Sequence, residues 1–261
     1  MDLGLKGRNA AITGSSRGIG NAIASALAAE GCNVALSGRD QGNLDKAVAT
    51  VAARGVTAVG VACDLATSAG CEAFVDGAVS GLGGLDILVN NVGGMVPGTL
   101  DSLTDEMWEQ VLNTNLMGYI WTTRYAVPHL KKSKAGRILM VSGVTGKQLL
   151  PGALTTTLPN AAIIGFCKLM AADLGPSGIT VNNICPGFTN TESWGPRAEA
   201  MARVRGTTAD GVRKAVADQT MLGRWAEPEE IGAAAAFLVS AKNAYMTGTT
   251  VEICGGFTKY L

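Results

Sequence analysis

The chain has 261 residues, with 21 Lys and Arg against 21 Asp and Glu and a single histidine, His129. A net charge of zero argues against the basic excess with which proteins collect nucleic-acid phosphates or anionic lipids. One histidine excludes a metal site built from several histidines and disfavours a Ser-His-Asp triad. We therefore expect a small-molecule substrate, with no nucleic acid, membrane or metal. Because only 16% of the residues are charged and 47% are hydrophobic, we also expect a homotetramer or homodimer.

Short apolar runs alternate with alanine-rich stretches of helical spacing. The runs typical of buried parallel strands are 10–12, 33–36, 58–61, 86–89, 137–141, 180–184 and 250–253. The stretches with helical spacing are 19–30, 43–54, 69–81, 105–130, 161–174 and 228–240. Strands that alternate with helices need crossover connections, which place helices on both faces of a parallel sheet. The sequence therefore predicts one α/β domain over 1–261, a doubly wound Rossmann-type fold of about seven parallel strands.

One segment, at about 187–226, breaks this alternation. It follows the sixth predicted strand, opens on Gly, Thr and Asn residues, and continues with Trp194, Arg197 and a weak helical pattern. A long insertion near the carboxyl ends of parallel strands is more often a cover for a ligand than a linker. We expect this segment, called the lid segment below, to close over a substrate.

Compartment and cysteine chemistry are also constrained. The first strand-like run begins near Arg8, which leaves no room for a signal peptide, and the apolar run 231–239 is far shorter than the roughly 20 residues of a membrane span. The cysteines show no CxxC and no zinc spacing; they are Cys32, Cys63, Cys71, Cys167, Cys185 and Cys254. We expect a cytoplasmic protein whose cysteines are small buried thiols.

A glycine-rich turn, Thr-Gly-Ser-Ser-Arg-Gly-Ile-Gly at 13–20, lies directly between the first predicted strand and the first predicted helix. Gly14 permits a tight turn, Gly18 lets backbone approach a pyrophosphate, and Gly20 lets helix and strand pack closely. The free N–H groups and the dipole of a helix N-terminus favour a bound anion. In this position the turn predicts a dinucleotide site.

The end of the second predicted strand bears on the choice of cofactor. An NAD site places a carboxylate there for the ribose 2′-hydroxyl, but this strand ends on Gly38. Arg39, helped by Arg17, instead suits the 2′-phosphate of NADP through charge-assisted hydrogen bonds. Asp40 is the alternative, because a shift of one or two residues restores an NAD site, although it is better suited to cap the next helix. We expect NADP rather than NAD.

Three motifs occur in a fixed order: the glycine-rich turn, Asn90-Asn91-Val92-Gly93 after the fourth strand, and Pro186-Gly187-Phe188-Thr189-Asn190-Thr191 after the sixth. In these motifs the chain resembles the short-chain dehydrogenase/reductase family, in particular members similar to 3-oxoacyl-carrier-protein reductase, from Leu5 to Gly256. The resemblance implies that Asp64 contacts the adenine, Asn90 fixes the cofactor side of the sheet, and Thr191 meets the nicotinamide amide or the phosphates. With the turn, the cofactor-binding residues expected are Gly14, Ser16, Arg17, Gly18, Ile19, Gly20, Arg39, Asp64, Leu65, Asn91, Gly93, Pro186, Gly187, Thr189 and Thr191.

The family's chemistry uses a tyrosine that gives a proton to a carbonyl oxygen, a lysine four residues later that lowers its pKa, a serine that holds the oxygen, and an asparagine that maintains a proton relay. The resemblance assigns the relay to Asn115 and the serine role to Ser142, at the end of the fifth strand. Thr156 stands at the tyrosine position and Asn160 at the lysine position. These four residues are the expected catalytic set.

An alkyl hydroxyl is a far weaker acid than a phenol, and an amide carries no charge that lowers a pKa. Loss of a positioned general acid typically costs roughly 10²–10⁴-fold in rate. Three substitutes remain open from the sequence: Tyr119, one helical turn after Asn115; Lys147, in the segment after Ser142; and a water held by Asn115 and Ser142.

We therefore expect an enzyme, an NADP-dependent oxidoreductase that interconverts a carbonyl and a secondary alcohol on a small or medium apolar molecule, with a non-standard proton donor. Two alternatives are a nucleotide-binding protein that has lost redox turnover and a non-redox lyase or isomerase on the same scaffold. Only the missing tyrosine and lysine favour these alternatives.

Overall fold

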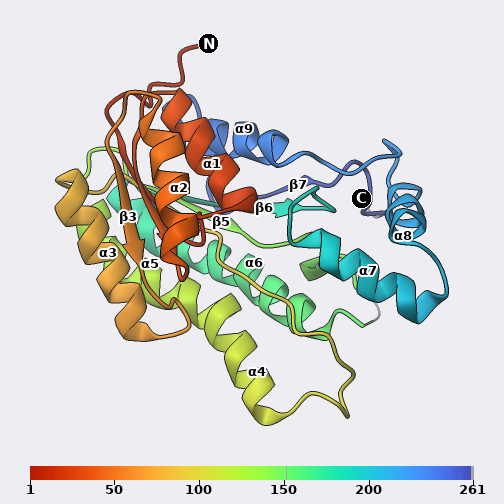
Figure 1. Ribbon diagram of the computed structural model, residues 1–261. Coiled ribbons are helices and arrows are strands. Elements are labelled where there is room, and N and C mark those ends of the chain that lie inside the picture. The colour runs from red at the N-terminus through yellow and green to blue at the C-terminus, as the bar shows by residue number, and fades with distance from the viewer. Residues whose placement is uncertain (151, 260–261) are drawn as a thin grey trace.

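The structure is a computed structural model that describes residues 1–150 and 152–259. In this part of the chain one parallel sheet runs in the order β3-β2-β1-β4-β5-β6-β7 (Figure 1). Its strands are β1 (Asn9–Ile12), β2 (Asn33–Gly38), β3 (Ala58–Ala62), β4 (Ile87–Asn90), β5 (Arg137–Val141), β6 (Thr180–Pro186) and β7 (Thr250–Ile253). The predicted doubly wound α/β fold is confirmed, and each predicted strand falls on an observed one.

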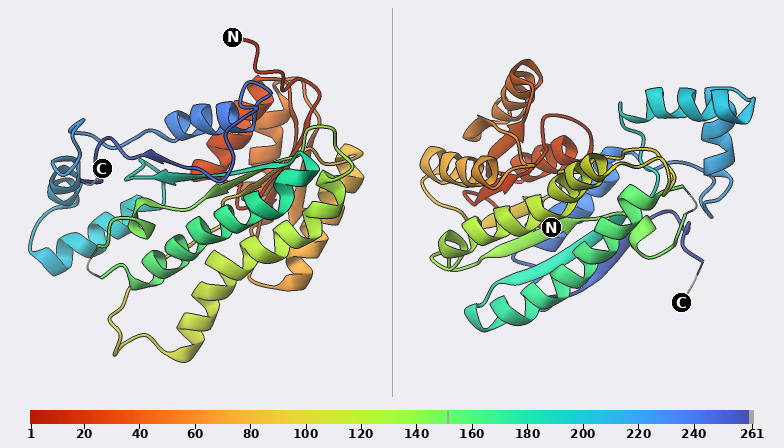
Figure 2. Two further views of the ribbon diagram at one scale, coloured as in Figure 1. Left: turned by 180° about the vertical axis from the view of Figure 1, so that it is seen from behind. Right: turned by 90° about the horizontal axis from the view of Figure 1, so that it is seen from below.

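Helices cover both faces of the sheet (Figures 1 and 2). They are α1 (Gly18–Ala29), α2 (Gln41–Ala52), α3 (Ser68–Leu82), α4 (Asp105–Leu112), α5 (Gly118–Leu130), α6 (Leu154–Leu174), α7 (Trp194–Arg205), α8 (Ala209–Ala217) and α9 (Pro228–Val239). Alternate strand residues point to opposite faces. Ile87 and Val89 therefore join the core under α1, α2 and α9, whereas Leu88 joins the core under α3, α5 and α6.

Glycines follow the first two helices, and an aspartate caps the second. Gly31 and Gly55 follow α1 and α2 with φ of +84° and +83°, a left-handed conformation that glycine adopts without strain. Asp40 precedes α2, and its carboxylate accepts a hydrogen bond from the Asn43 N–H at 2.7 Å. The expected N-cap role of Asp40 is thereby confirmed.

Two predicted helices differ from the observed ones. The helix expected over 105–130 is interrupted by a π-helical turn, Asn113–Met117, between α4 and α5. The helix expected from 161 begins at Leu154. The sequence did not predict its first turns as helix, because they contain three threonines and Pro159, and β-branched residues and proline disfavour helix. As a result Thr156 and Asn160 lie on a helix rather than in a loop.

The lid segment contains α7 and α8, which stand outside the layered body of the molecule (Figure 1). Its two ends are tied together, because Ala226 donates its N–H to the Phe188 carbonyl and accepts from the Asn190 N–H. Trp194 also packs edge-to-face on Trp225, with ring centroids 4.9 Å apart. The lid segment thus leaves and rejoins the body of the molecule at neighbouring points, where Trp194 and Trp225 form an aromatic base. Its closure over a ligand stays a prediction.

The described residues include no helix that is long and apolar enough to cross a membrane and no cluster of metal-ligating side chains. All six cysteines are free thiols. Four are buried, as expected, whereas Cys63 and Cys254 are half-buried.

Candidate functional site

A cleft of about 800 Å³ lies at the carboxyl ends of the strands. It brings together most of the residues that the sequence singled out. Those that line it are Gly14, Ser16, Arg17, Gly18, Ile19, Arg39, Asp64, Leu65, Asn91, Gly93, Gly187, Thr189 and Thr191, with Asn115, Ser142, Thr156 and Asn160. Two expected residues, Gly20 and Pro186, are buried and do not line it.

The glycine-rich turn is braced from behind by the loop after β4. The Asn91 side-chain amide donates to the carbonyl oxygens of Thr13 and Gly14, at 3.0 Å each. A Cβ on Gly20 would come within 2.5 Å of both the Gly14 oxygen and the Asn91 nitrogen. Gly20 therefore allows a close approach between α1, the turn and Asn91, rather than the contact with a strand that was expected, and its place behind the turn explains why it does not line the cleft.

The start of α1 is exposed to the cleft. Arg17 is the N-cap residue but makes no side-chain capping hydrogen bond, and the first turn contains no acidic residue. A helix N-terminus leaves four backbone N–H groups without partners inside the helix. Together with the helix dipole, these groups make the beginning of α1 suitable for an anion such as a phosphate.

Two arginines line the cleft. Arg17 follows Ser16 in the glycine-rich turn, and Arg39 follows Gly38 at the end of β2. A Cβ on Gly38 would lie 2.9 Å from that of Ser16, so a carboxylate side chain at this position has no room. Asp40 also borders the cleft, but one of its oxygens is already used to cap α2.

Ser142 follows β5 and is held by two side chains of β6. Its hydroxyl oxygen lies 2.9 Å from the Asn183 amide nitrogen and 3.0 Å from the Cys185 sulfur. Asn183 and Cys185 are fully buried. Neither residue belongs to a motif that the sequence predicted. Their contact with Ser142 depends on the register of β5 against β6, because Val141 pairs with Ile184 and so brings Ser142 beside Cys185.

Asn115 lies in the π-helical turn, and its side-chain amide is occupied by backbone. Its oxygen accepts from the Gly94 N–H at 2.8 Å, and its nitrogen donates to the Gly94 carbonyl at 2.7 Å and to the Thr155 carbonyl at 3.4 Å. Pro159, four residues after Thr155, has no N–H with which to complete the helical hydrogen bond. Asn115 therefore satisfies a carbonyl that the proline leaves open and ties the loop after β4 to α6.

Thr156 and Asn160 occupy the same wall of the cleft, one turn apart on α6. The Thr156 hydroxyl donates to the Ala153 carbonyl at 3.1 Å, and the Asn160 amide donates to the Thr145 hydroxyl at 2.8 Å. Both side chains are neutral hydrogen-bonding groups, so neither supplies an acid near neutral pH.

The two side chains considered as substitute acids already have partners within the protein, although Tyr119 borders the cleft. Tyr119 is 2% exposed and donates its hydroxyl to the Val141 carbonyl at 2.7 Å. Burial raises its pKa, which makes it a weaker acid. Lys147 forms an ion pair with Glu252 of β7 and is absent from the described residues that line the cleft.

The lid segment completes the cleft. Four of its residues that the catalytic and cofactor predictions did not include line it: Glu192, Ser193, Trp194 and Arg197. Phe188 packs on Trp194 and on Trp225, with ring centroids 5.6 Å apart in each pair. Trp194 therefore joins the aromatic base of the lid segment to the cleft wall.

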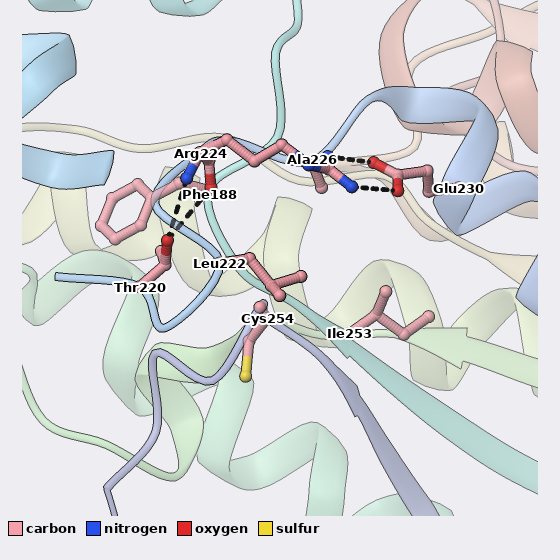
Figure 3. Close-up of a pocket in the computed structure, with 9 residues that line it drawn as sticks. Phe188, Thr220, Leu222, Arg224, Ala226, Glu230, Ile253 and Cys254 are labelled. Atoms are coloured by element: carbon pink, nitrogen blue, oxygen red, sulfur yellow. Dashed lines mark hydrogen bonds and ion pairs between the residues drawn. The ribbon is translucent and has the colours of Figure 1, made fainter. Parts of the chain in front are cut away.

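A second, smaller pocket of about 80 Å³ lies between the lid segment and the end of β7 (Figure 3). Figure 3 shows Phe188, Leu222, Ile253 and Cys254 around it, with Arg224 held by both oxygens of Glu230 at 2.7 Å each. Its volume is too small for a dinucleotide, and it contains none of the expected site residues.

The chain is similar to known proteins over nearly its whole length. The family described as "Enoyl-(Acyl carrier protein) reductase" matches residues 14–258. The chain is 37% identical to oxidoreductase UcpA of Salmonella typhimurium, covering 97% of this chain and 95% of that protein. It is 33% identical to the 3-oxoacyl-[acyl-carrier-protein] reductase of Staphylococcus aureus, covering 95% and 97%.

Two similar solved structures contain a bound cofactor. L-sorbose reductase from Gluconobacter frateurii, complexed with NADPH and L-sorbose, superposes with a TM-score of 0.96 at 33% identity over 100% of both chains. A short-chain dehydrogenase from Burkholderia cenocepacia in complex with NADP has a TM-score of 0.87 at 33% identity, covering 97% of this chain and 98% of that one.

Proposed function

Because the chain belongs to the short-chain dehydrogenase/reductase family, we propose that it is an NADP(H)-dependent oxidoreductase that interconverts a carbonyl and a secondary alcohol on a small or medium apolar substrate. One observation carries the cofactor assignment: Arg17 and Arg39 line the cleft next to an α1 N-terminus that no side chain caps. The similarity to structures that contain NADPH or NADP supports the same assignment.

The residues present suit this cofactor. Backbone N–H groups at the start of α1 would bind the pyrophosphate, and the two arginines would bind the 2′-phosphate. Asp64 and Leu65 would border the adenine, and Thr191 the nicotinamide amide or the phosphates. The remaining cofactor contacts proposed are Gly14, Ser16, Gly18, Ile19, Asn91, Gly93, Gly187 and Thr189, with Gly20 and Pro186 supporting them from behind. When bound, NADPH supplies the hydride.

Carbonyl reduction also needs a group that positions the substrate oxygen and a donor that gives this oxygen a proton. Ser142 and Thr156 hold the substrate oxygen by hydrogen bonds, and Asn160 binds a ribose hydroxyl. Because Tyr119 donates to Val141 and Lys147 pairs with Glu252, a water is the best candidate for the proton donor. Ser142 and the Asn115 side-chain oxygen would hold this water, since both residues line the cleft and that oxygen can accept a second hydrogen bond beside the one from the Gly94 N–H.

The test follows NADPH absorbance with a panel of ketones, quinones and 3-oxoacyl thioesters, for the wild type and for a Thr156→Tyr/Asn160→Lys double variant. Turnover by the wild type is the expected result. Turnover by the double variant alone contradicts the proposal and favours a nucleotide-binding protein that has lost redox activity. Product formation with no net change in NADPH favours a lyase or isomerase.

Two further features belong to this proposal. The lid segment closes over the substrate, because Ser193 and Trp194 already line the cleft. The protein forms a homodimer or homotetramer, which is supported by exposed apolar side chains on α6, such as Leu158 and Leu169, and by Phe237 on α9. A monomer mass in light scattering at working concentration would refute the oligomer.

A further inference from the structure

Arg197 is a cation of the cleft that the proposed cofactor does not use. It lies on α7 and lines the cleft, with its guanidinium carbon 5.5 Å from the centroid of the Trp194 ring. No hydrogen bond or ion pair joins this guanidinium to another residue within 1–150 and 152–259. Burial lowers the pKa of Arg197, with no acidic side chain acting to offset it.

A half-buried charge without a partner is unfavourable, because desolvation is not repaid by attraction. Arg213 provides the comparison within the same segment. Its guanidinium carbon lies 5.2 Å from the centroid of Trp225, but it also donates to the Asn190 side-chain oxygen at 3.1 Å. Both arginines stack on a tryptophan, and only Arg197 borders the cleft. The missing partner of Arg197 is therefore to be sought in the cleft.

The other cations of the cleft are already assigned. Among the described residues that line it, the basic side chains are Arg17, Arg39 and Arg197. The first two flank the end of β2 and serve the 2′-phosphate in the proposed function, while the start of α1 serves the pyrophosphate. Arg197 comes from the lid segment, one helical turn after Trp194, and remains for a ligand other than the cofactor.

We propose that Arg197 binds an anionic group of the substrate, a carboxylate or a phosphate, so that the substrate combines the apolar, carbonyl-bearing part of the proposed function with an acidic group at one end. The inference rests on the proposed function, since it assigns the remaining volume of the cleft to a carbonyl substrate. A guanidinium presents paired N–H groups that match two oxygens of a carboxylate or phosphate. The Trp194 ring beside it offers an apolar face to the carbon chain of the same molecule.

The test measures equilibrium binding to the full-length protein loaded with NADP⁺, by calorimetry, so that turnover is not required. Two matched probe pairs differ in charge: acetoacetate with methyl acetoacetate, and dihydroxyacetone phosphate with dihydroxyacetone. The wild type is expected to bind at least one acid ten times more tightly than its neutral partner. The pair that shows the preference identifies the anion as carboxylate or phosphate.

Three variants complete the experiment. Arg197→Gln is expected to weaken binding of the preferred acid about tenfold or more, a loss typical of a charged hydrogen bond, and to leave the neutral partner unchanged. Arg197→Lys, which keeps the charge, is expected to recover part of the affinity. Arg213→Gln, which removes an arginine stacked on the other tryptophan, is expected to behave as the wild type.

Several results would overturn the inference. The first is that the wild type binds the acid and its neutral partner with equal affinity in both pairs. The second is that Arg197→Gln loses the same affinity for the acid and for its neutral partner. The third is that this variant binds NADP⁺ more weakly, which would assign Arg197 to the cofactor. Preferential binding of an acid without NADPH oxidation would instead count against the proposed redox function and leave the anion site standing.

Discussion

The side-chain nitrogen of Asn183 lies 2.9 Å from the hydroxyl oxygen of Ser142, across the neighbouring strands β6 and β5. Asn183 is fully buried, and its side-chain oxygen has no hydrogen-bond partner among the described residues. A buried amide group without a partner is unfavourable. A contribution to the stability of the fold therefore does not explain why an asparagine lies here. Its hydrogen bond to Ser142 does, because that bond fixes the serine oxygen at the edge of the cleft.

Asn183→Val is expected to lower kcat of carbonyl reduction about fivefold, because the hydrogen bond that orients Ser142 is worth ~1 kcal/mol. The Kd for NADPH is expected to stay unchanged. Asn182→Val is the matched control, since Asn182 is buried next to it but bonds Met246 and Thr249 instead. Equal effects of the two substitutions on kcat would show that Asn183 acts only through stability.

Arg39→Asp is expected to reduce the preference for NADPH over NADH about 10- to 100-fold, because a hydrogen bond to a charged group contributes ~1.5–3 kcal/mol. Fluorescence titration with both nucleotides measures the ratio of the two affinities. Arg54→Asp makes the same charge change on an exposed residue outside the cleft and serves as the control. An unchanged ratio in Arg39→Asp would exclude a role in cofactor choice.

Gly20→Ala is expected to destabilise the fold and abolish nucleotide binding. The added Cβ would come within 2.5 Å of the Gly14 oxygen and the Asn91 amide nitrogen, so the glycine-rich turn must move. Overpacking of this kind typically costs ~1–3 kcal/mol. Gly42→Ala, where the Cβ meets only an Asp40 oxygen at 3.6 Å, is expected to unfold as the wild type in urea. Equal unfolding midpoints for the two variants would contradict this account.

Acid stability is expected to depend on Glu230. Hydrogen bonds from Arg224 and from the Glu227 N–H lower the pKa of Glu230 to about 2. A carboxyl whose folded pKa is depressed stabilises the protein above its unfolded pKa, and this stabilisation is lost as pH falls through the folded pKa. The melting temperature of the wild type should therefore fall between about pH 4.5 and 2, and that of Glu230→Gln should fall less steeply. Glu229→Gln, a neighbouring exposed site, is expected to retain the wild-type slope.

Alkylation by iodoacetamide is expected to reach Cys254 first. Partial burial opposes ionisation of this thiol, but hydrogen bonds from Thr258 and from the Gly256 and Phe257 N–H groups outweigh it and lower the pKa. Burial raises the pKa of Cys63, which is also half-buried, to about 12. Thiolate is the reactive form, so peptide mapping should find Cys254 modified well before Cys63. Thr258→Val should slow the reaction, and faster labelling of Cys63 would refute the assignment.

Local sequence was sufficient for the strands, for the glycine-rich turn and for the cap of α2. Strands β5 and β7 begin and end where the apolar runs do, because buried parallel strands are short apolar segments bounded by polar residues. The turn 13–20 was recognisable because its glycines, its strand and its helix are contiguous, and Asp40 was recognisable as a cap because capping is a contact between near neighbours.

Contacts between distant segments required the tertiary structure. Asn183 and Ser142 meet through the β5–β6 register, and Asn115 reaches the Thr155 carbonyl only because the π-helical turn faces α6. The sequence determined which residue types are present, including Thr156 and Asn160, which the resemblance assigns to the positions of an acid and its partner. Only the tertiary structure decided that Tyr119 donates its proton to the Val141 carbonyl and that Arg197 lines the cleft without a polar partner among the described residues, because burial and pairing depend on which distant segments lie alongside.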